Sequence, residues 1–114
     1  MPQFPTGLAA QLISAGSADS VALNSDSAII TTKALATTAL TSYTFTIQCA
    51  QLKPTSIPIV ELGNGSNTQG VPIVATVTAA ATQISPGTLT IVIFNAHASQ
   101  ALNGTLVLAV LLIG

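Results

Sequence analysis

Charge is what this sequence has least of: only 4% of its 114 residues are Asp, Glu, Lys or Arg, against about a quarter in an ordinary soluble domain. The charged side chains are Asp19, Asp26, Lys33, Lys53 and Glu61. Soluble monomers keep a mixed, charged surface, whereas the cores of protein interfaces are depleted of charge. We therefore expect other subunits to cover much of the surface; the alternative is an unusually neutral monomer.

Arginine is absent, and two lysines cannot supply the row of cations that neutralises nucleic-acid phosphates. The same shortage argues against binding to an anionic membrane surface. The best candidate for a membrane-spanning segment, 106–113, has eight residues, and about 20 are required to cross a bilayer. The sequence therefore predicts neither a nucleic-acid partner nor a membrane partner.

Cysteine is almost absent as well. Cys49 is the only one, so no disulfide can form within the chain. Residues 1–5 also lack the basic region and following apolar run with which a secretory signal begins. Both features favour a protein that is synthesised in a cytoplasm.

Residues that carry chemistry are too few for a catalytic or metal site. His97 is the only imidazole, and nucleophilic catalysis would require it beside a serine or beside Cys49; a buried cysteine that behaves as a small apolar residue is the favoured alternative. Asp19 and Asp26 lack the spacing of a calcium loop, and one histidine with one cysteine cannot complete a zinc site. We predict no catalytic residues, no metal ligands, no cofactor and no enzyme, and we expect Asn95 and His97 to hold their loop by hydrogen bonds.

What the sequence does contain is a series of short β-strand patterns. Apolar and polar residues alternate, or β-branched residues accumulate, between segments of turn-forming residues. The predicted strands are 28–32, 35–40, 43–49, 57–62, 73–78, 88–94 and 105–113, with turns or loops at 63–70 and 85–87. Pro58 marks one of them as an edge strand. Because no long helical pattern occurs, residues 27–114 are predicted to form an all-β, antiparallel two-sheet β-sandwich that is jelly-roll-like.

Residues 1–26 differ from this body, because they combine Pro, Gly, Ser and Ala with few bulky apolar residues. We interpret the segment as an extended N-terminal arm that a neighbouring molecule orders, since chain termini stay mobile unless they are tied down. A disordered tail is the alternative. The apolar residues of the arm, which we predict to contact this neighbouring molecule, are Phe4, Leu8, Leu12 and Ile13.

The last predicted strand is apolar on both faces. A strand of this kind requires cover on both sides. In a thin sandwich one face meets the core, so the other face would meet a second sheet or a neighbouring subunit. We therefore predict self-association through this strand, at Leu106, Leu108, Val110 and Leu112; burial of the strand within one chain is the alternative.

Three segments of the body, 41–47, 63–72 and 94–106, together resemble small β-sandwich modules in the virions of tailed bacteriophages. The Asn-x-His-x-x-x-x-Leu-Asn-Gly pattern within the third segment is the most specific of them. The resemblance implies a structural virion protein, commonly a trimer, that is either a capsid decoration (cement) protein or a module of a tail fibre or spike. The chain shows no long repetitive shaft and no attachment domain, which favours a decoration protein.

We therefore expect a homotrimer on the outside of a capsid, made in the host cytoplasm and bound to several copies of the major capsid protein. Binding only to the assembled lattice would stabilise that lattice by mass action. The alternative is a receptor-binding module of a tail fibre or spike, with the loops 63–70 and 95–104 in contact with host glycan. Few aromatic residues are available for stacking on sugar, and we expect Tyr43 and Phe45 on opposite faces of their strand.

Overall fold

The computed structural model of the chain describes residues 10–80 and 87–114. All regular structure in these residues is β, with eight strands and no helix, so no helix that could cross a membrane occurs there. The strands are β1 (Gln11–Ser14), β2 (Ser20–Leu23), β3 (Ser27–Thr31), β4 (Ser42–Cys49), β5 (Ile57–Asn64), β6 (Pro72–Ala80), β7 (Gly87–Asn95) and β8 (Leu106–Ile113). The predicted all-β class is confirmed.

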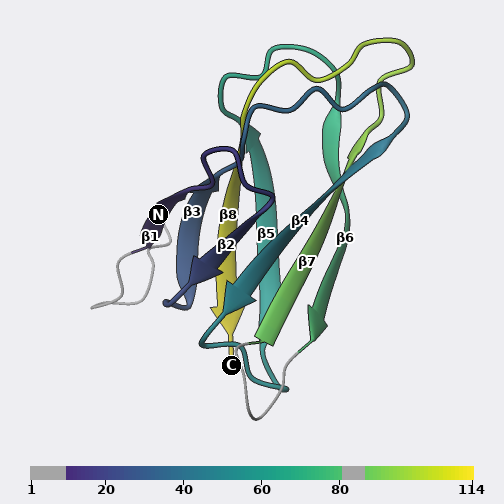
Figure 1. Cartoon of the computed structure of the whole chain (residues 1–114). Helices are drawn as coiled ribbons and strands as arrows, with labels where there is room; N and C mark the ends of the chain where they lie inside the picture. Colours follow the sequence, from purple (N-terminus) through teal and green to yellow (C-terminus); the bar gives the residue numbers. More distant parts are fainter. Residues whose placement is uncertain (1–9, 81–86) are drawn as a thin grey trace, which may run out of the picture.

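The strands form two four-stranded sheets that pack against each other (Figure 1). Sheet A has the order β1-β3-β8-β5, and sheet B has the order β2-β4-β7-β6. Four of the neighbouring pairs are antiparallel, but β1 runs parallel to β3 and β2 runs parallel to β4. The two-sheet arrangement agrees with a β-sandwich; the two parallel pairs do not confirm a jelly roll, which is antiparallel throughout.

Strict alternation along the strands builds the core. In β7, Leu89, Ile91 and Ile93 are buried, while Thr88 and Thr90 between them are half-exposed. Successive side chains of a strand point to opposite faces, so each sheet turns one apolar row inward. The buried apolar residues of the two sheets and their loops form one cluster: Leu23, Ala28, Ile30, Leu35, Phe45, Ile47, Cys49, Leu52, Leu89, Ile91, Ile93, Leu102, Leu106, Leu108, Val110 and Leu112.

Two local expectations meet different outcomes. β5 pairs only with β8 and is an edge strand, as Pro58 predicted, because proline cannot donate a ladder hydrogen bond. The predicted strand 35–40 does not form, and only an isolated bridge joins Leu35 to Gly104. The chain turns instead at Leu40, which has a positive φ of 59° and donates its N–H to the carbonyl of Asn95. Of the predicted turn 85–87, only Gly87 lies within the described residues.

β1 and β2 fall in the segment that was predicted as an arm. Each pairs with a strand of its own chain and forms one edge of a sheet. The extended arm is therefore not confirmed over residues 11–23. Strands of four residues are too short to show a clear period, and their partners lie further along the chain, so no local pattern indicates them. Of the predicted capsid-contacting residues, Phe4 and Leu8 lie outside the described residues.

Candidate interaction surface

The outer faces of the two sheets differ in chemistry. On sheet B, many outward positions of β4, β7 and β6 carry threonine: Thr44, Thr46, Thr76, Thr78, Thr88 and Thr90. Threonine suits a pleated strand while its hydroxyl stays in contact with water. The four described strands of sheet B contain no charged side chain, so this face is uncharged, with threonines over one part and an apolar group of Ile73, Val92 and Phe94 over another.

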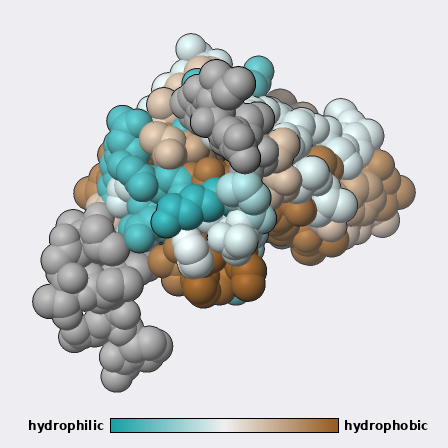
Figure 2. Space-filling model, turned by 90° about the horizontal axis from the view of Figure 1, so that it is seen from below, coloured by the Kyte–Doolittle hydropathy of each residue, from teal (hydrophilic) through white to brown (hydrophobic). Residues whose placement is uncertain are grey.

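The outer face of sheet A is apolar. Residues that pair across neighbouring strands point to the same side of a sheet, and this side carries Leu12, Ile29, Ile57, Ile59, Val107, Ala109, Leu111 and Ile113, which we call the apolar face. Four of its side chains are exposed, Leu12 at 80%, Ile57 at 61%, Ile113 at 45% and Ile59 at 40%. The other four, at 29, 107, 109 and 111, are partly buried. Seen from below, hydrophobic residues form one group at the bottom of the view and another at its right side, apart from the hydrophilic group on the left (Figure 2).

The predicted self-association residues are on the other side of β8. Leu106, Leu108, Val110 and Leu112 are between 0% and 6% exposed and lie in the core of their own chain. They therefore cannot contact another copy, and the prediction of those four residues is wrong. Because both faces of this strand are apolar, its sequence does not distinguish the face that packs against sheet B from the outer face. The face available for a partner carries Val107, Ala109, Leu111 and Ile113.

Two of the residues predicted to contact the capsid, Leu12 and Ile13, lie within the described residues, and they point to opposite sides of sheet A. Leu12 points outward from β1 onto the apolar face, whereas Ile13 is partly buried and packs against the core. They are neighbours in one strand, so they point to opposite sides of sheet A. Of these two residues, only Leu12 is exposed to a partner.

One row of side chains crosses the whole apolar face. Leu12 of β1 pairs with Ile29 of β3, Ile29 pairs with Ala109 of β8, and Ala109 pairs with Glu61 of β5. Within the four strands of sheet A, Glu61 is the only charged side chain. The row thus runs from the most exposed leucine at one edge to a single carboxylate at the other edge.

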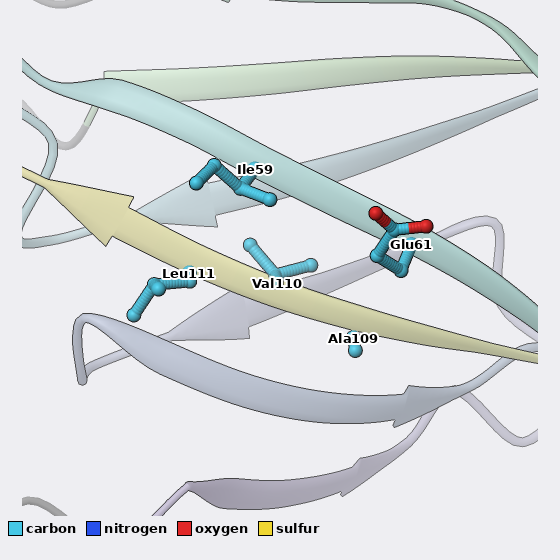
Figure 3. A pocket seen from close by; sticks show the side chains of 5 residues that line it. All are labelled: Ile59, Glu61, Ala109, Val110 and Leu111. Atoms are coloured by element: carbon cyan, nitrogen blue, oxygen red, sulfur yellow. The ribbon is translucent and has the colours of Figure 1, made fainter. Parts of the chain in front are cut away.

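A shallow hollow lies at the carboxylate end of this row (Figure 3). It is lined by Ile59 and Glu61 of β5 and by Ala109, Val110 and Leu111 of β8. Ala109 has only a methyl group where its neighbours on the same face have larger side chains, which accounts for the depression. The lining is apolar except for the Glu61 carboxylate, so the hollow matches an apolar side chain of moderate size.

Other charges lie in a small network near the sheet edges. Lys33 Nζ is 2.8 Å from Asp19 Oδ1, and the Tyr43 hydroxyl donates a hydrogen bond of 2.8 Å to the same oxygen. The hydrogen bonds from Lys33 and Tyr43 lower the pKa of the Asp19 carboxyl, while burial and the Asp19 contact raise the pKa of Tyr43.

Tyr43 and Phe45 lie on the same face of β4, and their rings are 6.4 Å apart. The expectation that they lie on opposite faces is therefore wrong, because residues two apart in a strand share a face.

The loops at the other end of the sandwich are held by a buried amide. Asn95 is fully buried; its Oδ1 accepts the N–H groups of Val71 and His97, and its Nδ2 donates to the carbonyls of Thr37 and Gln100. All four hydrogen-bonding positions of the amide are therefore used, which is what a buried side chain of this type requires.

His97 completes this arrangement. Its Nδ1 accepts the N–H groups of Ser99 and Gln100 at 3.0 and 2.9 Å. A nitrogen that accepts hydrogen bonds carries no proton, so the proton of the neutral ring sits on Nε2. The expectation that Asn95 and His97 hold the loop by hydrogen bonds is confirmed.

Cys49 behaves as a small apolar residue. It is fully buried in the core, and burial raises the pKa of its thiol to about 11. Its hydrogen bond goes to the carbonyl of Ile47. Over residues 10–80 and 87–114, no three His, Cys, Asp or Glu side chains come close enough together to hold a metal ion.

Comparison of the chain with protein families, with curated proteins and with solved structures finds no match. The apolar face is the structural feature that bears on function.

Proposed function

We propose that this chain is a structural virion protein: a capsid decoration protein that forms a homotrimer and binds the capsid exterior across neighbouring capsid subunits. The observation that carries the proposal is the apolar face of sheet A, with Leu12, Ile57, Ile59 and Ile113 each at least 40% exposed. An apolar surface of this kind, in a chain with so few charges, favours cover by other subunits.

The size of the face is compatible with an interaction site. β5 and β8 have eight residues each, and β1 and β3 are shorter, so the whole outer side of sheet A, polar residues included, covers on the order of 400 Å² at about 3.3 Å per residue and about 4.8 Å per strand. The largest apolar patch on an ordinary monomer covers about 300–600 Å² and is often functional.

The capsid-binding part of the proposal rests on the resemblance and on the chain before β1. Phe4 and Leu8 are the residues that we propose to contact the major capsid protein. Contacts from several copies would act together, because one trimer leaves the lattice only when all of them break. The jelly-roll arrangement and the extended arm belong to this proposal as well.

Self-association is tested first by light scattering on a sizing column over a range of concentrations. We expect three times the 11.4 kDa mass of the chain. Ile57→Asp on the apolar face should shift the protein toward monomer, whereas Ile73→Asp, at a 44% exposed position on the outer face of sheet B, should not. A monodisperse monomer at high concentration would overturn the trimer.

Capsid binding is tested separately by co-sedimentation with capsids of the parent phage that were assembled without this protein. The trimer should pellet with the capsids, and deletion of residues 2–9 should leave the trimer intact and abolish pelleting. Full occupancy by the truncated protein would exclude a role of these residues in binding.

The tail-fibre alternative receives less support. Glycan sites often stack sugar on aromatic rings, and neither 63–70 nor 95–104 contains Phe, Tyr or Trp. Tyr43 is half-buried with its hydroxyl bound to Asp19, and Phe45 is in the core. We therefore place the decoration protein first.

A further inference from the structure

We propose that two copies of this chain join edge to edge through β6, antiparallel about a two-fold axis at Val77, so that sheet B continues from one copy into the next. The inference goes beyond the proposed function, because this contact uses the edge of sheet B and leaves the apolar face of sheet A free.

β6 is a sheet edge with little protection against pairing. In the described part of the chain it pairs only with β7, and it lies at the edge of sheet B (Figure 1). Its nine residues contain no charged side chain, and its proline, Pro72, is the first residue of the strand. An edge strand presents unpaired N–H and C=O groups, which natural proteins protect with short strands, charges, bulges or proline. A long, uncharged edge is suited to the addition of a further strand.

The other three sheet edges are better protected. β1 and β2 have four residues each, so either could form only a short ladder. β5 is long, but Pro58 and the carboxylate of Glu61 lie in it. Among the described edges, β6 is therefore the one that combines length with the absence of charge.

One bulge interrupts β6, and it lies beside the centre of the proposed contact. Ala75 is the extra residue, between Val74 and Thr76. From Thr76 to Ala80 the register with β7 is continuous, so this part of the strand keeps the extended shape that pairing requires. Alanine has only a methyl group, so the bulge brings no bulky side chain to the edge.

The sequence around Val77 favours a second copy as the partner. Residues 75–79 read Ala-Thr-Val-Thr-Ala, the same in both directions. When two identical strands pair antiparallel about a two-fold axis at Val77, each residue meets the one at the mirrored position. Thr76 of each copy then lies opposite Thr78 of the other. Threonines directly opposite each other stabilise a ladder by hydrogen bonding, and an unrelated strand would not match this symmetry.

The two faces of β6 suit the same contact. Thr76 and Thr78 are exposed on the outer face of sheet B, so their hydroxyls are free to bond across the axis. Val77 points to the opposite face, where it is partly buried and packs against the core. In the dimer, Val77 of each copy lies beside Val77 of the other, and the apolar core continues across the axis.

Disulfide cross-linking tests the register. Residues directly opposite in an antiparallel ladder have Cβ atoms about 4.5–5.5 Å apart, close to the separation that a disulfide spans. Thr76→Cys combined with Thr78→Cys should therefore give covalent dimers on mild oxidation. Thr88→Cys combined with Thr90→Cys, at the same spacing on the outer face of β7 but inside the sheet, should not. The native Cys49 is buried and does not compete.

Thr78→Cys alone should remain monomeric on oxidation, because its new thiol faces Thr76. Covalent dimers from this single variant, formed as fast as from the double variant, would overturn the axis at Val77. Equal cross-linking of the β6 and β7 double variants would overturn pairing through β6.

The mass of the uncross-linked protein tests the pairing itself. Pairing through one short ladder is weak, so light scattering is extended to about 1 mM protein. Ile57→Asp, which removes the apolar-face contact, should rise from one copy to two over this range. Thr78→Lys in the same background should raise the dissociation constant at least about tenfold, since it removes the Thr76–Thr78 contacts and places like charges near the axis. Thr90→Lys, on the neighbouring strand, should leave it unchanged.

The wild-type chain separates this inference from the proposed trimer. We expect its mass to rise from three copies toward six, as trimers join through β6. A mass that stays at three copies, with no cross-linking, would refute the pairing through β6 and leave the trimer standing. A rise from one copy to two that Thr78→Lys abolishes would support the pairing and refute the trimer, and a monomer throughout would refute both.

Discussion

Asn95 shows how far one side chain can organise a loop region without any charge. Its four hydrogen bonds tie its own loop, at 97 and 100, to residues 37 and 71, which are distant in the sequence. Its position within an Asn-x-His pattern drew attention to it, and its role as a holder of the loop was predicted. The hydrogen-bond partners of Asn95 were not predicted, because they are backbone groups, which every residue has and which leave no pattern in the sequence. Only the folded chain brings them within reach of one buried amide.

Gly70 is expected to be essential for this arrangement. It has a φ of +74°, and a Cβ there would lie 2.8 Å from Leu102 Cδ2 and 3.0 Å from Asn95 Oδ1. Gly16 has a similar φ of +63° but no atom within 4 Å of such a Cβ. Gly16→Ala should lower the free energy of unfolding by about 1 kcal/mol, from the left-handed backbone alone. Gly70→Ala should lower it by about 2–4 kcal/mol, because overpacking adds to that cost.

Urea unfolding of both variants beside wild type measures the difference between them. Equal losses would mean that only the backbone conformation matters and that Asn95 and Leu102 move aside without cost.

At the scale of elements, the strands themselves were largely predictable. The expected strands at 43–49, 57–62, 73–78, 88–94 and 105–113 correspond to β4 to β8 within a few residues, and 28–32 corresponds to β3. In each of these segments the alternation or the β-branched content is itself the cause of the strand. The failures, β1, β2 and 35–40, are segments in which pairing with distant strands or a turn decides the outcome.

β8 provides a test of which face is inside. Leu108→Ala removes a fully buried side chain and should lower the free energy of unfolding by about 2–5 kcal/mol. Leu111→Ala, on the apolar face of the same strand, should cost the monomer less, about 1 kcal/mol, since Leu111 is partly exposed.

Urea unfolding at low protein concentration isolates the monomer, and light scattering of Leu111→Ala then reports on the trimer. A larger loss of stability for Leu111→Ala than for Leu108→Ala would contradict the assignment of the two faces.

At the scale of the whole molecule, one polar network joins the two sheets. Lys33 follows β3 of sheet A, whereas Asp19 precedes β2 and Tyr43 lies in β4, both of sheet B. Because the pKa of Asp19 is lowered in the folded chain, its contribution to stability is complete above its unfolded value near 4. The contribution disappears as the pH falls through the lower, folded pKa.

Asp19→Asn should therefore reduce the fall in Tm between pH 5 and pH 2 relative to wild type. Lys33→Gln should act in the same direction, since the hydrogen bond from Lys33 is the largest cause of the lowered pKa. Thermal melts at the two pH values measure the effect. An unchanged slope in both variants would show that other carboxyl groups govern acid unfolding.

The sequence by itself determined that this chain is all-β, that it has few charged side chains, and that β8 is apolar on both faces. Composition and a two-residue period contain that information because each strand obeys them locally. The tertiary structure alone decided which face of β8 is the core, since that depends on where sheet B lies. It also placed Leu12 and Glu61, 49 positions apart in the sequence, in one row, because register between strands is set by the packing of the whole sheet.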